Sequence, residues 1–320
     1  MLVNIEHVGT APVASAPSWV RLLTSSARPG SIREDYTAST DQLVSWSMGS
    51  DGKAAVCWSV AEWDSALLGV TCAKVNSCGV VLSNAGCEPP LLVAALGELK
   101  TQAQSGLADN VFFRAPAADR AAVRAAEDAG FRTIGIHLEF SMDSTRGPEA
   151  EQSSAIGVRH AVSEDASALA DIADQFQDDR FHRDGRFDRA RVAILWKTSV
   201  RNALAGRAET VLVAETDHRV AGFLVFTTDA PVEDGDARPA GRVFLIAVCP
   251  AKRRRGVGSL LLREAHRYSE RHGFTGLRVG TQITNGAAIA QYEAAGFRLS
   301  EGFCELSWWA DAEAGGAGAT

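Results

Sequence analysis

The sequence lacks an excess of positive charge, a long apolar run and a signal-like start. Its 32 lysines and arginines are outnumbered by 39 aspartates and glutamates, which gives a net charge of −7. A general nucleic-acid-binding protein needs a basic surface, so that class is excluded. No run of about 18 apolar residues occurs, and the first residues show neither a basic nor an apolar leader. We therefore expect a cytoplasmic protein with no nucleic-acid and no membrane partner.

Closely spaced cysteines are also missing, since none of the six cysteines belongs to a Cys-x-x-Cys pair. A disulfide framework is uncommon in a chain of this size without an export signal. Histidine and cysteine do not cluster at the spacing of zinc ligands, so no metal is expected. Cys249 lies beside the glycine loop described below, but no histidine accompanies it locally. We do not expect it to be a nucleophile.

The length of 320 residues fits two domains, and a composition of 46% hydrophobic and 22% charged residues is that of an ordinary globular protein. Residues 1–50 are rich in small and polar residues with little periodicity, so a loosely ordered lead-in with one strand or one short helix is expected there. The first domain is predicted at 51–145 and the second at 157–310. The polar stretch 146–156 is the predicted linker, and 311–320 is the predicted disordered tail.

Helical and strand-like patterns alternate along both halves of the chain. The predicted helices are 91–105, 119–129, 163–176, 187–204, 258–272 and 285–295, and the predicted strands are 54–60, 110–114, 133–142, 211–215, 222–226, 243–248, 276–281 and 303–309. The run 243–248 has no polar residue, which predicts a central strand covered on both faces. The expected fold class is α/β (α+β), with a mixed central sheet flanked by helices.

One segment occurs twice in the chain. Residues 121–132 read AAVRAAEDAGFR and residues 287–298 read AAIAQYEAAGFR, with seven of the twelve positions identical. Each copy predicts a helix that ends at a glycine and is followed by a strand. Chance similarity of two alanine-rich helices is the alternative, but the flanking strands recur as well, which favours a duplicated fold. The first copy has Ala126 where the second has Tyr292, and it lacks the loop described next.

An Arg-x-x-Gly-x-Gly loop separates the predicted strand 243–248 from a helix that begins at Gly258. Glycine lets the backbone approach a ligand closely, and the unpaired N–H groups and dipole of a helix N-terminus attract an anion. The lysine and serine or threonine of a Walker A loop and the third glycine of the dinucleotide fingerprint are missing. The loop therefore predicts a diphosphate site, with a plain basic surface turn as the alternative. The neighbouring cations are Lys252, Arg253, Arg254 and Arg255.

The segment after the next strand reads Asn285-x6-Tyr292-x3-Gly296-Phe297. Together with the glycine loop, it makes residues 158–309 resemble the GNAT (Gcn5-related N-acetyltransferase) superfamily. The resemblance implies a GNAT fold in the second domain, a degenerate GNAT-like first domain, and acetyl-CoA as acyl donor with one CoA per chain. The positions that it implies for CoA binding are Leu245, Ile246, Ala247, Val248, Arg253, Arg254, Arg255, Gly256, Val257, Gly258, Ser259, Asn285 and Tyr292.

The resemblance also implies direct transfer of the acetyl group to an amine. The backbone N–H of Val248 would polarise the thioester carbonyl, and Tyr292 would protonate the leaving thiolate. A core aromatic is the alternative for Tyr292, and a helix N-cap is the alternative for Asn285. The general base is open, because the carboxylate expected on the strand after the first Gly-Phe is missing. His137 is the candidate in its place, with an ordinary strand histidine as the alternative.

A closer likeness indicates the acceptor. Trp63–Gly69, the segment 180–184 and the strand Leu277–Gln282 resemble the TDP-fucosamine acetyltransferase-like enzymes of the superfamily. Those enzymes acetylate the amino group of a nucleotide-linked deoxy sugar, so the likeness implies a small-molecule acceptor of this kind. Arg180, His182 and Asp184 would contact its phosphate and hydroxyls, with a solvated loop as the alternative. Another amine (an amino acid, antibiotic, polyamine or protein N-terminus), a non-catalytic CoA-binding protein and a homodimer all remain open.

Overall fold

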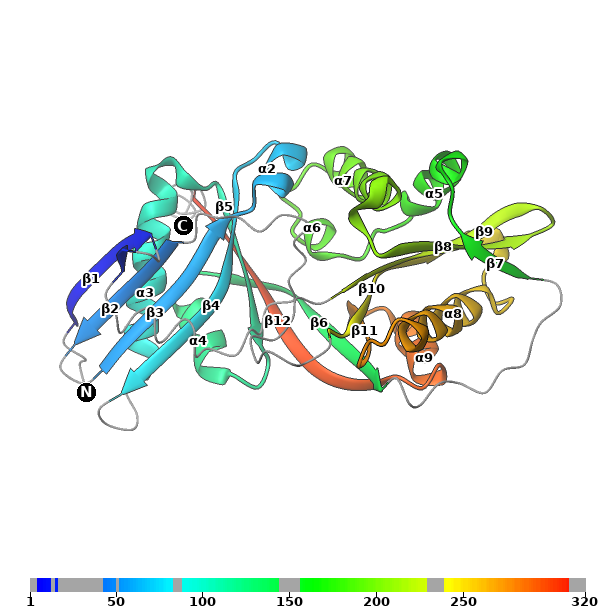
Figure 1. Cartoon of the computed structure of the whole chain (residues 1–320). Helices are drawn as coiled ribbons and strands as arrows, with labels where there is room; N and C mark the ends of the chain where they lie inside the picture. The colour runs from blue at the N-terminus through cyan, green and yellow to red at the C-terminus, as the bar shows by residue number, and fades with distance from the viewer. Residues whose placement is uncertain are drawn as a thin grey trace, which may run out of the picture. The chain divides into compact units, whose positions relative to one another are not determined.

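The computed structural model describes residues 5–12, 15–16, 43–49, 52–82, 88–143, 156–228 and 239–310. The chain divides into two compact units (Figure 1). The first contains Met1–Ile136, Arg183–Phe187 and Phe303–Thr320, and the second contains His137–His182 and Asp188–Gly302. Both units are therefore discontinuous in sequence. Most of the predicted linker and the predicted tail lie outside the described residues.

The first unit is built on a sheet with the strand order β1-β2-β3-β4-β5-β12. Its strands are β1 (Ile5–Pro12), β2 (Leu43–Gly49), β3 (Gly52–Val60), β4 (Cys72–Leu82), β5 (Asn110–Pro116) and, from Phe303 on, β12 (Arg298–Trp309). Only β4 and β5 pair in parallel. Its helical elements are α2 (Glu62–Leu68), α3 (Glu88–Gln102), the π-helical turn η2 (Ala103–Leu107) and α4 (Arg120–Asp128). The core lies where α3 and α4 pack on the sheet, around Trp58, Leu96 and Phe113.

Two strands occupy part of the range predicted to be a loosely ordered lead-in. β1 and β2 pair antiparallel, and β2 continues the sheet onto β3. Two serines of β2 are buried and hydrogen-bonded. Ser45 accepts a hydrogen bond from Trp58 Nε1 (3.1 Å), and Ser47 donates one to the Leu91 carbonyl (2.6 Å). Residues 44–48 of β2 do alternate between apolar and polar side chains, so the strand pattern was present in the sequence and was missed.

The second unit is built on a sheet with the strand order β6-β11-β10-β9-β8-β7. Its strands are β6 (Arg132–Asp143, from His137 on), β7 (Gly157–His160), β8 (Thr210–Thr216), β9 (Arg219–Thr228), β10 (Gly241–Val248) and β11 (Gly276–Gln282). Its helical elements are the 3-10 turn η3 (Ser163–Asp165), α5 (Ala166–Ala173), α6 (Arg180–Arg183, to His182), α7 (Arg189–Asn202), the π-helical turn η4 (Ala203–Arg207), the 3-10 turn η5 (Pro250–Lys252), α8 (Val257–Arg271) and α9 (Gly286–Ala294).

Helices cover both faces of this second sheet. Figure 1 shows α5 and α7 on one side of its strands and α8 and α9 on the other. Val243 of β10 belongs to the core under α8, whereas Leu245 of the same strand belongs to the core under α5 and α7. The predictions of a mixed sheet flanked by helices and of a central strand covered on both faces are confirmed.

The repeated segment has the same local structure in both copies. Asp119 caps α4 by accepting a hydrogen bond from the Ala122 N–H (3.0 Å), and Asn285 caps α9 through the Ala288 N–H (3.2 Å). Each helix ends near a glycine with positive φ, 87° at Gly130 and 97° at Gly296, and a strand follows. The helix, the glycine end and the following strand predicted for each copy are therefore observed.

The strand that ends each copy pairs with the other half of the sequence. β6 follows α4, yet it pairs antiparallel with β11, with Met142 opposite Leu277. β12 follows α9, yet it pairs antiparallel with β5, with Leu306 opposite Phe113. Each unit is therefore completed by a strand that the other half of the chain encodes.

Candidate functional site

The parallel strands β10 and β11 separate toward their carboxyl ends. They pair only at Gly241–Val243 and Leu277–Val279, while β10 stays paired with β9 as far as Val248. A register shift between Val243 and Leu245 marks a bulge in β10, and bulges bend a strand. The rest of β10 therefore borders a gap in the sheet, at the strand ends where α/β folds bind ligands.

The backbone of Val248 points into this gap. The Cys249 N–H donates to the Ala221 carbonyl (2.9 Å), which makes these two residues a hydrogen-bonded pair of the β9–β10 ladder. Bonded and non-bonded pairs alternate in antiparallel strands. Val248, opposite Gly222, therefore turns its N–H and C=O away from β9. Arg253 Nε accordingly donates to the Val248 carbonyl (3.2 Å), so the Val248 N–H faces the side where β11 has departed.

A left-handed loop joins this end of β10 to α8. Arg254 and Gly256 have φ values of 58° and 82°, and such turns gather successive N–H groups into a concave anion site. The first hydrogen bond within α8 runs from the Leu260 N–H to the Gly256 carbonyl (3.0 Å). The N–H groups of Val257–Ser259 precede it, so the helix geometry leaves them available to an anion.

The two glycines of the loop serve different purposes. A Cβ on Gly256 would meet nothing within 4 Å, so its positive φ is the reason for glycine there. A Cβ on Gly258 would lie 2.4 Å from Gln291 Nε2, so glycine at that position leaves room for this side chain of α9. The first glycine allows the left-handed backbone of the loop, and the second accommodates Gln291.

Two of the four cations near the loop are engaged by protein groups. Lys252 Nζ lies 2.9 Å from Asp217 Oδ2. The Arg253 guanidinium binds the Val248 carbonyl and also donates to Gln175 Oε1 (2.9 Å). Arg254 and Arg255 are exposed. Positive charge for an anion at this loop therefore comes chiefly from these last two side chains and from the backbone.

Tyr292 lies on α9 in the core under α8, and only 4% of its surface is exposed. Its ring packs edge-on against Phe140, with ring centroids 5.7 Å apart. Burial raises the pKa of the Tyr292 phenol above its usual value, and the negative charge of Glu139 adds to the shift. The phenol therefore keeps its proton at neutral pH, which is the state that a proton donor needs. The side chain of the other predicted residue of this segment, Asn285, is the α9 cap described above.

His137 belongs to a buried ionic network on β6. Its Nε2 lies 3.0 Å from Glu139 Oε1, and Glu139 also accepts hydrogen bonds from Arg242 Nη1 (3.2 Å to each oxygen). Gly280 faces Glu139 across the strands, and a Cβ there would lie 2.3 Å from His137 Nε2. Glycine at this position of β11 is therefore what makes room for the imidazole.

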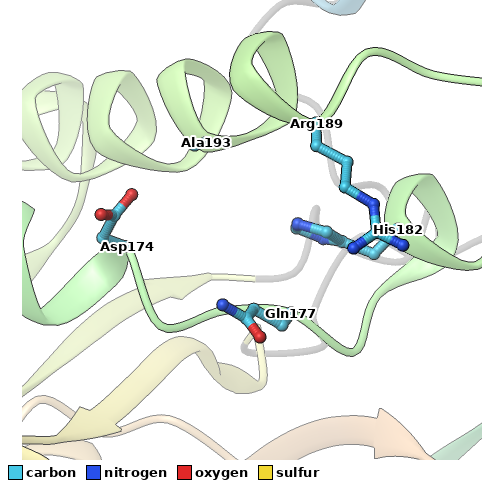
Figure 2. A pocket seen from close by; sticks show the side chains of 5 residues that line it. All are labelled: Asp174, Gln177, His182, Arg189 and Ala193. Carbon is cyan, nitrogen blue, oxygen red and sulfur yellow. The ribbon is translucent and has the colours of Figure 1, made fainter.

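A polar pocket of about 270 Å³ lies between the end of α5, α6 and α7. Figure 2 shows the side chains of Asp174, Gln177 and His182 around the same space, with Arg189 descending from the start of α7. Ala193 completes the lining. Asp174, Gln177 and Arg189 were missed from the sequence. The only available signal was the polar run between two amphipathic helices.

The three residues predicted to contact the acceptor lie in different surroundings. His182 lines the pocket. The Arg180 guanidinium lies over the Phe181 ring, 4.5 Å from its centroid. Asp184 is buried in the first unit, where it accepts hydrogen bonds from Ser307 Oγ and from Trp309 Nε1 (2.8 Å). Of the three, His182 alone lines this pocket.

Neither a metal-ligand cluster nor a membrane-spanning helix occurs among the described residues. No group of three or more histidine, cysteine, aspartate or glutamate side chains in them could hold a metal ion. No helix within the described ranges is long and apolar enough to cross a membrane.

The family model of the acetyltransferase (GNAT) family matches residues 169–297. Many solved structures share the fold, among them three that cover 95% or 96% of this chain, and no curated protein matches the chain. A GCN5-related N-acetyltransferase from Sphaerobacter thermophilus is 16% identical, with a TM-score of 0.61 over 95% of this chain and 96% of that one. A tandem GNAT protein from the clavulanic acid biosynthesis pathway is 15% identical, with a TM-score of 0.56 over 95% and 99% of the two chains.

The third structure is a GCN5-related glucosamine N-acetyltransferase region of a fungal multi-domain GH3 β-N-acetylglucosaminidase. It is 14% identical, with a TM-score of 0.62 over 96% of this chain and 38% of that one. These identities are low, so the three structures establish the fold alone. Residues 169–297 thus match the model of the acetyltransferase (GNAT) family, and the chain has the GNAT fold.

Proposed function

We propose that the protein is an acetyl-CoA-dependent N-acetyltransferase that transfers the acetyl group directly to a primary amine, the amino group of a nucleotide-linked amino deoxy sugar. One observation carries the proposal of acetyl transfer. The strands β10 and β11 separate beside a left-handed loop, and the Val248 N–H faces the gap between them. The loop suits a diphosphate. The gap between the strands suits an extended arm that ends in a thioester.

The donor is held mainly by backbone groups. The N–H groups of Arg254–Ser259 bind the diphosphate of CoA, helped by the α8 dipole and by the exposed guanidinium groups of Arg254 and Arg255. The free edge of β10 at Leu245–Val248 hydrogen-bonds the amides of the pantetheine arm. Asn285 keeps α9 in place through its cap, so that Tyr292 lies beside the arm.

Acetyl-CoA supplies an acetyl group as a thioester, and three groups of the chain assist its transfer. The Val248 N–H hydrogen-bonds the carbonyl oxygen, which gains negative charge as the amine attacks. His137, held by Glu139, takes the proton that the amine loses when the C–N bond forms. Tyr292 gives its proton to the sulfur as the C–S bond breaks, and burial keeps that proton in place until then.

The acceptor site is proposed at the pocket between α5, α6 and α7. Its lining offers a carboxylate, an amide, an imidazole and a guanidinium, which suit sugar hydroxyls and phosphate. His182 contacts the acceptor there, Arg180 lies beside it in α6, and Asp184 anchors the end of this segment. An amino-sugar acceptor is also named for the fungal region that shares the fold. We expect the enzyme to act in the cytoplasm.

Thiol release from acetyl-CoA tests the proposal, measured with a panel of acceptors. The panel contains TDP-linked 4-amino-4,6-dideoxygalactose, free amino sugars, amino acids, aminoglycosides, polyamines and a peptide with a free N-terminus. Turnover with the nucleotide sugar at the highest kcat/KM is expected. A higher kcat/KM with another amine would overturn the sugar assignment alone. CoA binding without thiol release on any amine would instead indicate a non-catalytic CoA-binding protein.

A further inference from the structure

The loop Asp174–Asp179 between α5 and α6 crosses the open end of the gap between β10 and β11. At one end, Gln175 accepts a hydrogen bond from Arg253 Nη2 (2.9 Å), and Arg253 Nε binds the Val248 carbonyl at the end of β10. At the other end, Asp178 accepts one from Thr284 Oγ1 (2.7 Å), two residues after β11 ends. The loop is thus tied to both strands that border the proposed thioester site.

The middle of the loop is anchored to the core and to α7. The Phe176 ring packs on Trp196 (5.5 Å between centroids) and on Phe223 (6.5 Å). Asp174 forms an ion pair with Lys197 (2.9 Å). These contacts hold the loop in one place, so the side chains that follow it are held in a defined orientation.

Asp179, the last residue of the loop, receives four hydrogen bonds. Its Oδ1 accepts from the backbone N–H groups of Phe181 (2.8 Å) and His182 (3.1 Å). Its Oδ2 accepts from Trp196 Nε1 (2.8 Å) and pairs with His182 Nδ1 (2.6 Å). The indole and the amides are donors only, so the Asp179 carboxylate is the acceptor in these three hydrogen bonds.

This arrangement fixes the tautomer of His182. Because Asp179 accepts, Nδ1 carries the proton, and the neutral imidazole has a bare lone pair on Nε2. The ring lines the pocket in Figure 2, so Nε2 offers the pocket a hydrogen-bond acceptor. The other lining residues are Asp174, Gln177, Arg189 and Ala193, which give an alkyl chain little apolar surface.

We propose that His182 is a specificity-determining residue that accepts a hydrogen bond from a hydroxyl of the acceptor, and that Asp179 is its positioning residue. The acceptor class is therefore a hydroxylated amine, an amino alcohol or amino sugar, in preference to a plain alkylamine. The inference rests on the proposed function, because the bound hydroxylated amine is an acceptor only if the protein transfers an acetyl group. The tautomer and the hydroxyl preference can be measured without any turnover.

Nitrogen NMR of the full chain with ¹⁵N-labelled histidine tests the inference, with His182 assigned by the loss of its signals in His182→Gln. The protonated nitrogen is expected to be Nδ1. Addition of trans-2-aminocyclohexanol should move the Nε2 signal, whereas cyclohexylamine, the same ring and amine without the hydroxyl, should not. A proton on Nε2, an equal response to both amines, or no response to either would overturn the inference.

Asp179→Asn provides the matched variant, because its amide can donate to Nδ1 and move the imidazole proton to Nε2. The response to the hydroxylated amine should then be lost while acetyl-CoA affinity stays unchanged. In the thiol-release assay, the KM for a hydroxylated acceptor should rise roughly tenfold, as for one lost hydrogen bond. An unchanged KM in Asp179→Asn would overturn the positioning role. If this variant does not fold, the wild-type comparison of the two amines decides alone. Absence of thiol release with every acceptor would overturn the proposed function and leave the NMR result standing.

Discussion

Replacement of Gly256 by aspartate, with asparagine as the control, gives the sharpest test of the diphosphate site. Gly256 has a φ of 82°, and a Cβ there would meet nothing within 4 Å. Asparagine and aspartate adopt this left-handed conformation more readily than other side chains. Both variants therefore carry the same backbone cost, about 1–2 kcal/mol, and differ from each other by one negative charge.

The size of the charge effect follows from the exposure of the loop. Two unit charges about 4 Å apart interact by about 1 kcal/mol in water and by about 4 kcal/mol at an effective dielectric constant of 20. Gly256 is exposed, so a value of about 1–2 kcal/mol is appropriate. The Gly256→Asp variant should then bind acetyl-CoA roughly 5- to 30-fold more weakly than Gly256→Asn.

Isothermal titration calorimetry of the two variants at low and high salt measures this ratio. Screening should reduce it as ionic strength rises. Gly206→Asp is the positional control, because Gly206 also has a positive φ (93°) and open space around its Cβ but lies in η4. That variant should leave acetyl-CoA affinity unchanged. Equal affinity of Gly256→Asp and Gly256→Asn would refute the assignment of the loop to the diphosphate.

Three further predictions concern catalysis and stability. Tyr292→Phe should lower kcat roughly tenfold or more without changing acetyl-CoA affinity, if the phenol protonates the thiolate; an unchanged kcat in the thiol-release assay would reject that role. Glu139→Ala should lower the free energy of unfolding by about 3 kcal/mol, because it leaves the buried Arg242 guanidinium without this carboxylate. A double-mutant cycle with Arg242→Met should give a favourable coupling energy, and additive effects would contradict the pairing. Hydrogen bonds from Arg159 hold the pKa of Asp165 below its usual value. A lowered folded pKa adds stability above the unfolded pKa of about 3.9 that is lost at lower pH. Urea unfolding should therefore show Asp165→Asn less stable than wild type at pH 7, and this difference should shrink as the pH falls below about 4.

Local features of the sequence predicted the local structure of the second unit well. The apolar run 243–248 became β10, the glycine loop became the start of α8, and the repeated Ala-Gly-Phe-Arg segments became matching helix ends. These features depend on propensity, capping and periodicity over a few residues, which a sequence displays directly. The same reasoning located the loop and the strand that carry the proposed donor site.

Contacts between distant residues could not be predicted in the same way. No sequence pattern near Asp184 indicates that it accepts hydrogen bonds from Ser307 and Trp309. Likewise, no pattern near Arg253 indicates that its guanidinium donates hydrogen bonds to Gln175 and to the Val248 carbonyl. Such contacts depend on tertiary packing. Of the residues that line the pocket, the sequence predicted only His182, because the lining residues come from separate elements that tertiary packing brings together.

The exchange of β6 and β12 means that neither half of this duplicated chain is a self-sufficient protein. A fragment made of the second half alone would lack β6, and with it His137 and Glu139. A fragment made of the first half alone would lack the β12 residues Leu306 and Trp308 from its core. Expressed separately, both fragments should aggregate through an unpaired strand edge, and co-expression should restore a soluble pair. The first half of the chain has no counterpart of the Arg253–Gly258 loop, yet the sheet of the second unit depends on β6, which the first half encodes.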